Sequence, residues 1–210
     1  MRPSSSDFSD SEMGALRRKY HFCGMPLIYT FSAGAAQIAV WKVEESESEL
    51  WKTIPYSTAD AEYLRRISHP RRRLESLAAR AALNALPQAR IQPFLSLSHS
   101  FPWAAAATAP HPIAIDIEKQ RPFPEKVADY FTQKPEQEAF IHQQKTFWHA
   151  WCAKEVAYKL LCRDFDKVSF KKELWFDGEQ VVFRRGVVVR RIGLFFVEGE
   201  EWLLAVGSFM

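Results

Sequence analysis

Apolar and polar residues alternate along the chain with two different periods, which predict where its strands and helices lie. The pattern first becomes strand-like after Met25, and residues 38–43 are the clearest stretch. Two amphipathic stretches at 45–51 and 58–67 predict short helices. Residues 70–87 are rich in Ala, Leu and Arg and lie between two prolines, which predicts a long helix.

Strands are expected after this helix, at 94–98, 103–108 and 113–118, and the order of helices followed by strands then occurs a second time. Helices at 126–131, 136–143 and 146–161 follow, and then strands at 168–176, 180–184, 187–197 and 202–209. Residues 77–86 and 151–160 would be equivalent helices, although few of their residues are identical. We therefore predict an α+β fold of two pseudo-repeated halves, each a long helix packed on a mostly antiparallel sheet, with a ligand cleft between them.

The first segment of the chain follows neither period. Residues 1–24 contain Ser, Asp and Arg but no apolar run of the length found in a secretory signal. We interpret them as a loose extension, and an upstream translation artefact is the alternative. Residues 25–112 and 113–210 would then be the two halves.

Composition excludes several classes of protein. With 210 residues and 47% hydrophobic residues, the chain can bury a core without disulfides. A net charge of +3 is too balanced to indicate a nucleic-acid partner, and no apolar run approaches the roughly 20 residues of a membrane helix. Cys23, Cys152 and Cys162 form neither a disulfide framework nor a C-x-x-C pair, so we expect a soluble protein of the reducing cytoplasm.

A strand with two carboxylates is the first candidate for chemistry. At 113–118, isoleucines alternate with Ala114, Asp116 and Glu118, so both carboxylates lie on the face opposite the isoleucines. Their Cα atoms would be about 6.5–7 Å apart, a span that two carboxylates can close around one Mg²⁺. The alternative is a pair of solvated charges on an edge strand.

Two charged residues lie on the aromatic face of the helix expected at 146–161. At 100° per residue, Glu155 and Lys159 fall in one stripe with Trp148 and Trp151. A mutual i,i+4 ion pair is the simple explanation. Combined with the strand carboxylates, however, they give three carboxylates and a lysine, a set suited to metal-assisted phosphate chemistry.

Further candidate anion contacts lie in the first half. Arg71, Arg72 and Arg73 begin the helix at 70–87, where a bound anion would offset the unfavourable helix dipole; a solvated basic surface is equally consistent. The serines around His99 could bind a phosphate, and the absence of a G-x-S-x-G motif argues against a serine hydrolase. Solvated strand faces are the simplest interpretation of four further arginines: Arg184, Arg185, Arg190 and Arg191.

Three motifs together resemble those of the 4'-phosphopantetheinyl transferase superfamily, in its monomeric, two-half type. The motifs are Leu97-Ser98-His99-Ser100, similar to I-S-H-S; Ile113-Ala114-Ile115-Asp116-Ile117-Glu118, similar to I-G-I-D-I-E; and residues 151–159, similar to W-x-x-K-E-x-x-x-K. The resemblance extends from about Met25 to the C-terminus. It implies transfer of the phosphopantetheine arm of coenzyme A to a serine of an acyl or peptidyl carrier protein, with Mg²⁺ as cofactor.

The resemblance also implies roles for individual residues near the pyrophosphate. Asp116, Glu118 and Glu155 would hold Mg²⁺ against the coenzyme A pyrophosphate. Lys159 would neutralise the charge that develops there, so that Asp116 and Lys159 both serve the coenzyme A site. Glu136 would be the general base for the carrier serine.

Other implied contacts concern the 3'-phosphate of coenzyme A and the carrier. His99, beside Ser98, matches the family's contact to the 3'-phosphate, and Arg72 would join it. The basic residues 65–73 could receive an acidic carrier. No nucleic acid or membrane is implied as a partner.

The sequence departs from the family pattern at two places. Gln92-Pro93 stands where the family has G-K-P, and Ala114 replaces a glycine. Neither change removes a metal ligand, so we expect an active enzyme. The alternatives are a family member that binds coenzyme A or carrier protein without turnover, and a structural protein with solvated carboxylates.

Overall fold

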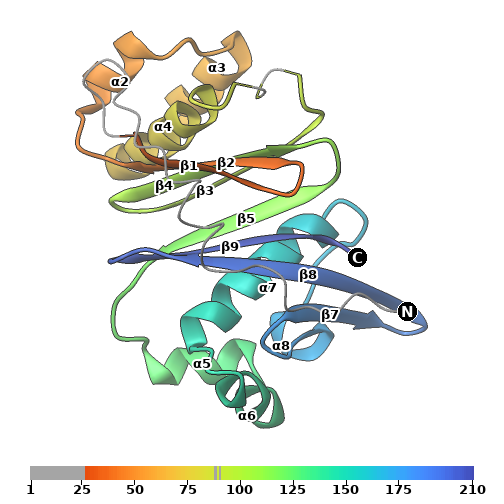
Figure 1. Ribbon diagram of the computed structural model, residues 1–210. Helices are drawn as coiled ribbons and strands as arrows, with labels where there is room; N and C mark the ends of the chain where they lie inside the picture. Colours follow the sequence, from red (N-terminus) through yellow and green to blue (C-terminus); the bar gives the residue numbers. More distant parts are fainter. Residues whose placement is uncertain (1–26, 88, 90) are drawn as a thin grey trace.

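Two antiparallel sheets lie face to face, with helices on their outer sides (Figure 1). The computed structural model describes residues 27–87, 89 and 91–210. The first sheet has the order β1 (Leu27–Ala33), β2 (Ala36–Lys42), β4 (Trp103–Ala109), β3 (Phe94–Ser100). The second has the order β5 (Ile113–Lys119), β9 (Trp202–Phe209), β8 (Val188–Glu198), β7 (Gln180–Arg185), β6 (Leu174–Phe176). The predicted α+β fold is confirmed.

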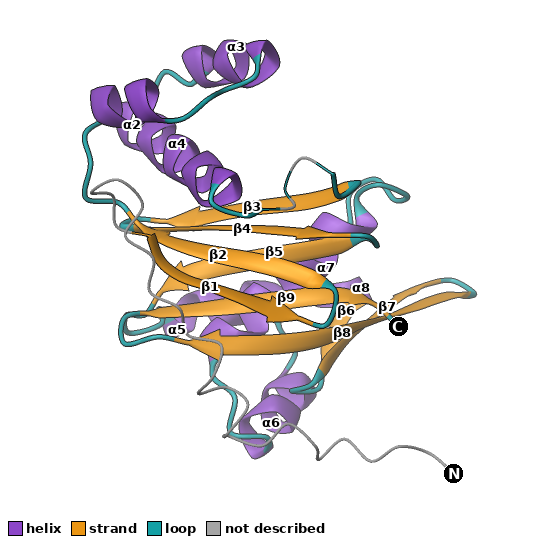
Figure 2. Cartoon of the chain, turned by 45° about the horizontal axis from the view of Figure 1, so that its top comes forward, coloured by secondary structure: helices purple, strands orange, loops and turns teal. Residues whose placement is uncertain are grey.

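Each sheet has a long helix on its outer face. The first sheet carries α2 (Glu47–Thr53), α3 (Thr58–Arg66) and the long α4 (Pro70–Asn84). The second sheet packs on the long α7 (Phe147–Leu161), beside α5 (Glu125–Phe131), α6 (Lys134–His142) and α8 (Phe170–Glu173). Figure 2 shows α2, α3 and α4 at one end of the molecule and α6 at the other. The extension expected at 1–24 lies outside the described residues.

The strand predicted over 168–176 is wrong in its first part. Residues Phe170–Glu173 form the helix α8, and only Leu174–Phe176 form a strand. The Ser169 side chain caps the helix by accepting a hydrogen bond from the Lys172 N–H (3.3 Å). A serine cap followed by Lys and Glu favours a helical turn over a strand.

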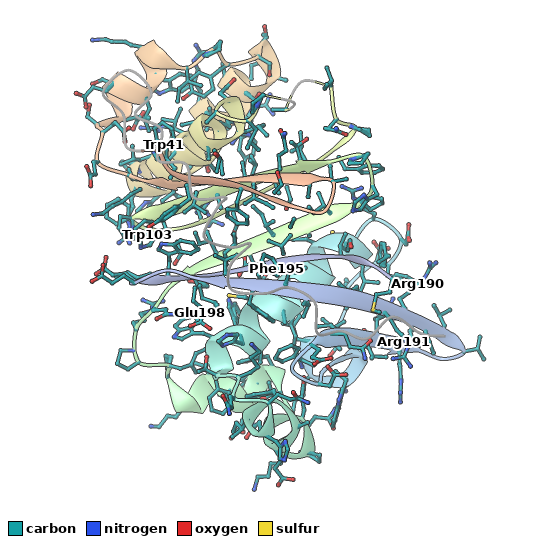
Figure 3. The ribbon with its side chains drawn as sticks, in the orientation of Figure 1. Trp41, Trp103, Arg190, Arg191, Phe195 and Glu198 are labelled. Atoms are coloured by element: carbon teal, nitrogen blue, oxygen red, sulfur yellow. The ribbon has the colours of Figure 1, made fainter. Side chains whose placement is uncertain are left out.

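The space between the two sheets is filled by apolar side chains from both. Ile113, Ile115 and Ile117 point into this core and are at most 3% exposed, which confirms the predicted alternation along β5. In Figure 3, Trp103 lies on the side of the first sheet that faces the second, whereas Trp41 lies on the helix side. Arg190 and Arg191 lie away from both, on exposed positions of β8.

Helix α7 approaches the second sheet closely because the residues beneath it are small. A Cβ atom at Gly207 would lie 2.7 Å from Val156 Cγ1, so no larger residue fits there. Ala114, its partner in the register of β5 and β9, is buried in the same core. The methyl group that Ala114 adds to the family's glycine is therefore accommodated under α7. This contact places α7 directly over the carboxylate face of β5.

No helix among the described residues is both long enough and apolar enough to cross a bilayer.

Candidate functional site

Along one side of the two facing sheets, their edge strands β3 and β5 lie side by side and are joined through serine hydroxyls. Backbone N–H groups of alternate β5 residues donate to alternate β3 serines. The three hydrogen bonds join Ile115 to Ser96 (3.0 Å), Ile117 to Ser98 (3.1 Å) and Lys119 to Ser100 (3.2 Å). This seam places the predicted Ser98–Ser100 segment beside the predicted carboxylate strand.

Asp116 is the centre of the polar cluster on the covered face of β5. Its Oδ1 accepts hydrogen bonds from Ser98 Oγ (2.9 Å) and from Lys159 Nζ (2.8 Å). Its Oδ2 is buried without a hydrogen-bond partner among the described residues. Because only 6% of Asp116 is exposed, the alternative of a solvated charge is wrong for this residue.

Lys159 connects α7 to this strand. Its ammonium group pairs with Asp116 and also donates to Ile115 O (2.8 Å). The simple explanation from the sequence, an i,i+4 ion pair with Glu155, is therefore not the contact that Lys159 makes. Its side chain remains 29% exposed. The ammonium group is therefore fixed at the carboxylate cluster and still accessible to an anion.

Glu118 lies next to Asp116 and receives a hydrogen bond on each carboxylate oxygen. Ser100 Oγ donates to Oε2 (2.6 Å) and Trp151 Nε1 donates to Oε1 (3.2 Å). Burial raises the pKa of Glu118, and the neighbouring charge of Asp116 raises it further. Two neutral donors orient the carboxylate but do not neutralise it.

Glu155 supplies the third carboxylate, from α7. Burial and the charge of Asp116 raise its pKa to about 7, with Lys159 acting in the opposite direction. The same two strand carboxylates raise the pKa of the buried Cys152 thiol, after the larger effect of burial. The carboxylates of Asp116, Glu118 and Glu155 are thus close enough to repel one another.

This donor set fits a hard divalent cation. An unpartnered buried oxygen on Asp116 and mutual repulsion that raises the pKa of Glu155 are both relieved when a cation is bound. Over the part of the chain that the structure describes, however, no three His, Cys, Asp or Glu side chains are already grouped as metal ligands. The residues present are the correct type for Mg²⁺ and would have to close around it.

A cleft of about 900 Å³ opens beside the carboxylate cluster, between the two halves. Its lining is mainly basic and comes from α4, the end of β3 and the end of β5. The lining residues are His69, Arg71, Arg72, Glu75, His99, Ser100, Phe101, Glu118, Lys119 and Arg121. Because Glu118 lines the cleft, an anion bound there would be adjacent to the carboxylates.

His99 and Arg72 both lie in this cleft, as neighbours. Nδ1 of His99 is 3.2 Å from Glu75 Oε2. Burial lowers the pKa of His99, Glu75 raises it, and the positive charge of Arg72 lowers it again. The structure therefore brings together these two predicted contacts to the 3'-phosphate.

The three consecutive arginines of α4 separate into two groups. Arg71 and Arg72 line the cleft, where the Arg71 guanidinium lies 4.6 Å from the centre of the Phe101 ring. Arg73 points elsewhere and pairs with Glu47 through two hydrogen bonds (2.6 and 3.1 Å). The helical period thus places two of the three arginines in the cleft and one in a structural ion pair.

Glu136, the predicted general base, is not brought to the cluster. It is fully buried and its Oε1 is 2.6 Å from Lys154 Nζ. Its two oxygens also accept backbone hydrogen bonds from Phe176 (2.8 Å) and Gln133 (3.1 Å). These contacts are those of a structural ion pair. A general base must be able to reach the proton that it removes, whereas the Glu136 carboxylate is fully buried.

Sequence reasoning missed several residues of the cleft. Glu75 faces His99 because it lies one turn after Arg71 on the same face of α4, and the two residues form an i,i+4 ion pair (3.3 Å). Lys119 and Arg121 continue directly from the carboxylate strand. The signal that could have found Lys119 and Arg121 was their position just after Glu118, at the strand end, where functional side chains often gather.

Comparison with known families finds a similarity within the second half of the molecule. The family model of the 4'-phosphopantetheinyl transferase superfamily matches residues 112–190. Over these residues the chain is similar to that superfamily. The match contains Asp116, Glu118 and the α7 motif with Glu155 and Lys159, whereas the β3 motif lies outside it. No curated protein matches the chain.

The matched residues thus contain the carboxylates, and the preceding half supplies the serines and the basic cleft wall. The superfamily supports transfer of a phosphopantetheinyl group as the general activity. The geometry joins the matched domain to β3 through the serine seam and to α4 through the cleft. The carboxylate cluster and the cleft therefore draw residues from both sides of residue 112.

Proposed function

We propose that the protein transfers the 4'-phosphopantetheine arm of coenzyme A to a serine of an acyl or peptidyl carrier protein in an Mg²⁺-dependent reaction. Residues 25–112 and 113–210 act as two halves of this one catalytic unit. The observation that supports it best is the position of Glu118, which belongs to the three-carboxylate cluster and lines the basic cleft. A metal site directly beside a polyanion site is what pyrophosphate chemistry requires.

The residues divide the work according to their charge. Arg72 and His99 would bind phosphate in the cleft, and Lys159 would face the negative charge that develops on the leaving phosphate. Asp116, Glu118 and Glu155 would hold Mg²⁺, which supplies charge neutralisation at the pyrophosphate when bound. In the reaction the serine hydroxyl gives up its proton to a base and its oxygen bonds to the phosphorus that carries the arm. The P–O bond from that phosphorus to adenosine 3',5'-bisphosphate breaks, and its electron pair leaves with the bisphosphate.

The direct test is the mass of a carrier protein after incubation. Apo forms of fatty-acid, polyketide and peptide carriers are each incubated with the protein, coenzyme A and Mg²⁺. We expect at least one carrier to gain the mass of one phosphopantetheine arm, and a chelator to prevent the gain. Arg190→Ala, a change on the exposed part of β8 away from the cleft, serves as the matched control and should remain active.

Two other results would contradict this proposal. No mass gain on any carrier, with tight coenzyme A binding in calorimetry, would indicate a binding protein without turnover. In that case a Gln92→Lys variant, which restores the family's lysine, should recover transfer. If the protein does not bind coenzyme A at all, the result would support the remaining alternative, a structural protein.

A pair of adjacent arginines tests the phosphate contact. We expect Arg72→Ala to raise the KM for coenzyme A by about 10- to 100-fold, because a charge-assisted hydrogen bond contributes about 1.5–3 kcal/mol. Arg73→Ala should leave this KM unchanged, since Arg73 pairs with Glu47 outside the cleft. The measurement is steady-state kinetics of both variants.

Coenzyme A that lacks the 3'-phosphate makes the arginine test specific. If Arg72 meets the 3'-phosphate, the wild type and Arg72→Ala should have the same KM for dephospho-coenzyme A. A penalty that persists with this substrate would assign Arg72 to another part of the cofactor. An unchanged KM for coenzyme A itself would exclude Arg72 from the site.

A further inference from the structure

The serines of β3 differ in what their hydroxyl protons meet. Ser96, Ser98 and Ser100 each accept a backbone N–H from β5, and each hydroxyl has one proton left to donate. Ser98 donates its proton to Asp116, and Ser100 donates its proton to Glu118. The β5 residue at the corresponding offset from Ser96 is Ala114, which has no acceptor in its side chain.

The hydrogen bond that each serine accepts from a β5 N–H group determines where its own hydroxyl proton points. Because the β5 N–H occupies the acceptor side of the hydroxyl, the O–H bond of Ser100 is directed at Glu118 Oε2 (2.6 Å). Ser98 accepts in addition from Lys159 Nζ (3.4 Å), so its proton is directed at Asp116 Oδ1. Rigid strands therefore hold both hydroxyls as oriented donors.

This arrangement leaves particular carboxylate positions open. On Asp116, Ser98 and Lys159 both donate to Oδ1, and within the described residues Oδ2 has no hydrogen-bond partner, although the buried Cys152 thiol is a neighbour of this carboxylate. On Glu118, Ser100 and Trp151 hold one oxygen each, and each oxygen retains a lone pair. Both carboxylates are thus restrained in rotation before any ligand binds.

We propose that Ser98 and Ser100 are positioning residues that hold the Asp116 and Glu118 carboxylates in the orientation needed for a divalent cation. The proposal rests on the proposed function, because it assigns the cation to these carboxylates. The simpler alternative is that all three hydroxyls only join the two sheets. Ser96 distinguishes the two, since it accepts the same kind of backbone hydrogen bond but donates to no carboxylate of the described residues.

Calorimetric titration of Mg²⁺ into the protein saturated with coenzyme A tests the proposal. Removal of a hydrogen-bond partner from a metal ligand typically lowers metal affinity by about 10- to 100-fold, and we expect this loss for Ser100→Ala. Ser96→Ala should bind Mg²⁺ as the wild type does. Ser100→Thr retains the hydroxyl on a residue suited to a strand, and should restore the affinity.

Thermal unfolding of the same variants without metal provides the structural comparison. Ser96→Ala and Ser100→Ala each remove one acceptor for a β5 N–H, so we expect similar decreases in Tm. Equal Mg²⁺ affinity in Ser96→Ala and Ser100→Ala would overturn the positioning role and leave the proposed function intact. Absence of Mg²⁺ binding by the wild type would instead overturn the proposed metal site, and the positioning role with it.

Discussion

A Glu155→Gln variant is expected to lose transfer by at least about 100-fold while the metal-free protein becomes more stable above pH 7. Glutamine has the size of glutamate but no charge, so it is a poor ligand for a hard cation. The same loss of charge removes the repulsion from Asp116 and Glu118 and the cost of burial, which together raise the pKa of Glu155 to about 7. One substitution should therefore separate stability from activity.

The sign of the stability effect follows from proton binding. The folded pKa of about 7 lies above the ordinary value of 4.5, so between these pH values the folded state binds more protons than the unfolded state. Stability of the metal-free wild type should fall as the pH rises through this window. Above pH 7 the full cost is about 3 kcal/mol, a cost that the glutamine variant does not carry.

Unfolding in urea at pH 4.5, 6 and 8, with a chelator present, measures this difference. We expect the gain in Glu155→Gln to be small at pH 4.5 and largest at pH 8. Glu173→Gln is the control of opposite sign, because a hydrogen bond from Arg185 lowers the pKa of Glu173. That variant should be less stable than the wild type at pH 8. A pH-independent effect of Glu155→Gln would contradict the assignment.

Added Mg²⁺ should reverse the order of the two proteins. The ion binds the folded wild type only when Glu155 is deprotonated, so its stabilising effect should increase as the pH rises through about 7. Glu155→Gln should show little stabilisation by Mg²⁺ at any pH. Full transfer activity in this variant would exclude Glu155 from the metal site.

The alternation of residues along β5 was enough to predict which side chains are buried between the sheets and which share the carboxylate face. It could not show what covers that face, because α7 lies more than 25 residues further along the chain. Alternation also left open whether Asp116 is solvated. Asp116 is buried because α7 packs closely on the second sheet at Gly207, and such packing is a property of the tertiary structure.

Two parts of the site depend on contacts that no local pattern encodes. The seam between β3 and β5 uses serine hydroxyls as acceptors, and a serine in a strand carries no sequence signal for such a bond. Lys154 and Glu155 are adjacent in the chain, yet Lys154 is fully buried on one side of α7 while Glu155 faces the cluster. Helical geometry separates them by about 100°, but only the surrounding helices determine which side is the core.

Lys154 is expected to be the most sensitive position for stability, and Lys154→Met should lower the free energy of unfolding by about 3–5 kcal/mol. Its ammonium group pairs with Glu136 and donates to the carbonyl oxygens of Phe131 (2.7 Å), Phe170 (2.9 Å) and Leu174 (2.8 Å). Methionine would leave the Glu136 charge buried and three carbonyl groups without their donor. Chemical denaturation at pH 7 measures the loss.

The double variant Lys154→Met with Glu136→Leu supplies the control and tests the role of Glu136. The double variant leaves no buried unpaired charge, so it should recover the part of the loss that the Glu136 charge causes. The part that comes from the three carbonyl groups should remain. If the pair only holds α7 in place, the double variant should also transfer phosphopantetheine at a rate close to that of the wild type. If it folds but is inactive, the pair does more than hold α7 in place, which is consistent with the general base that the sequence predicted at Glu136. That role would require the buried carboxylate to become accessible during the reaction.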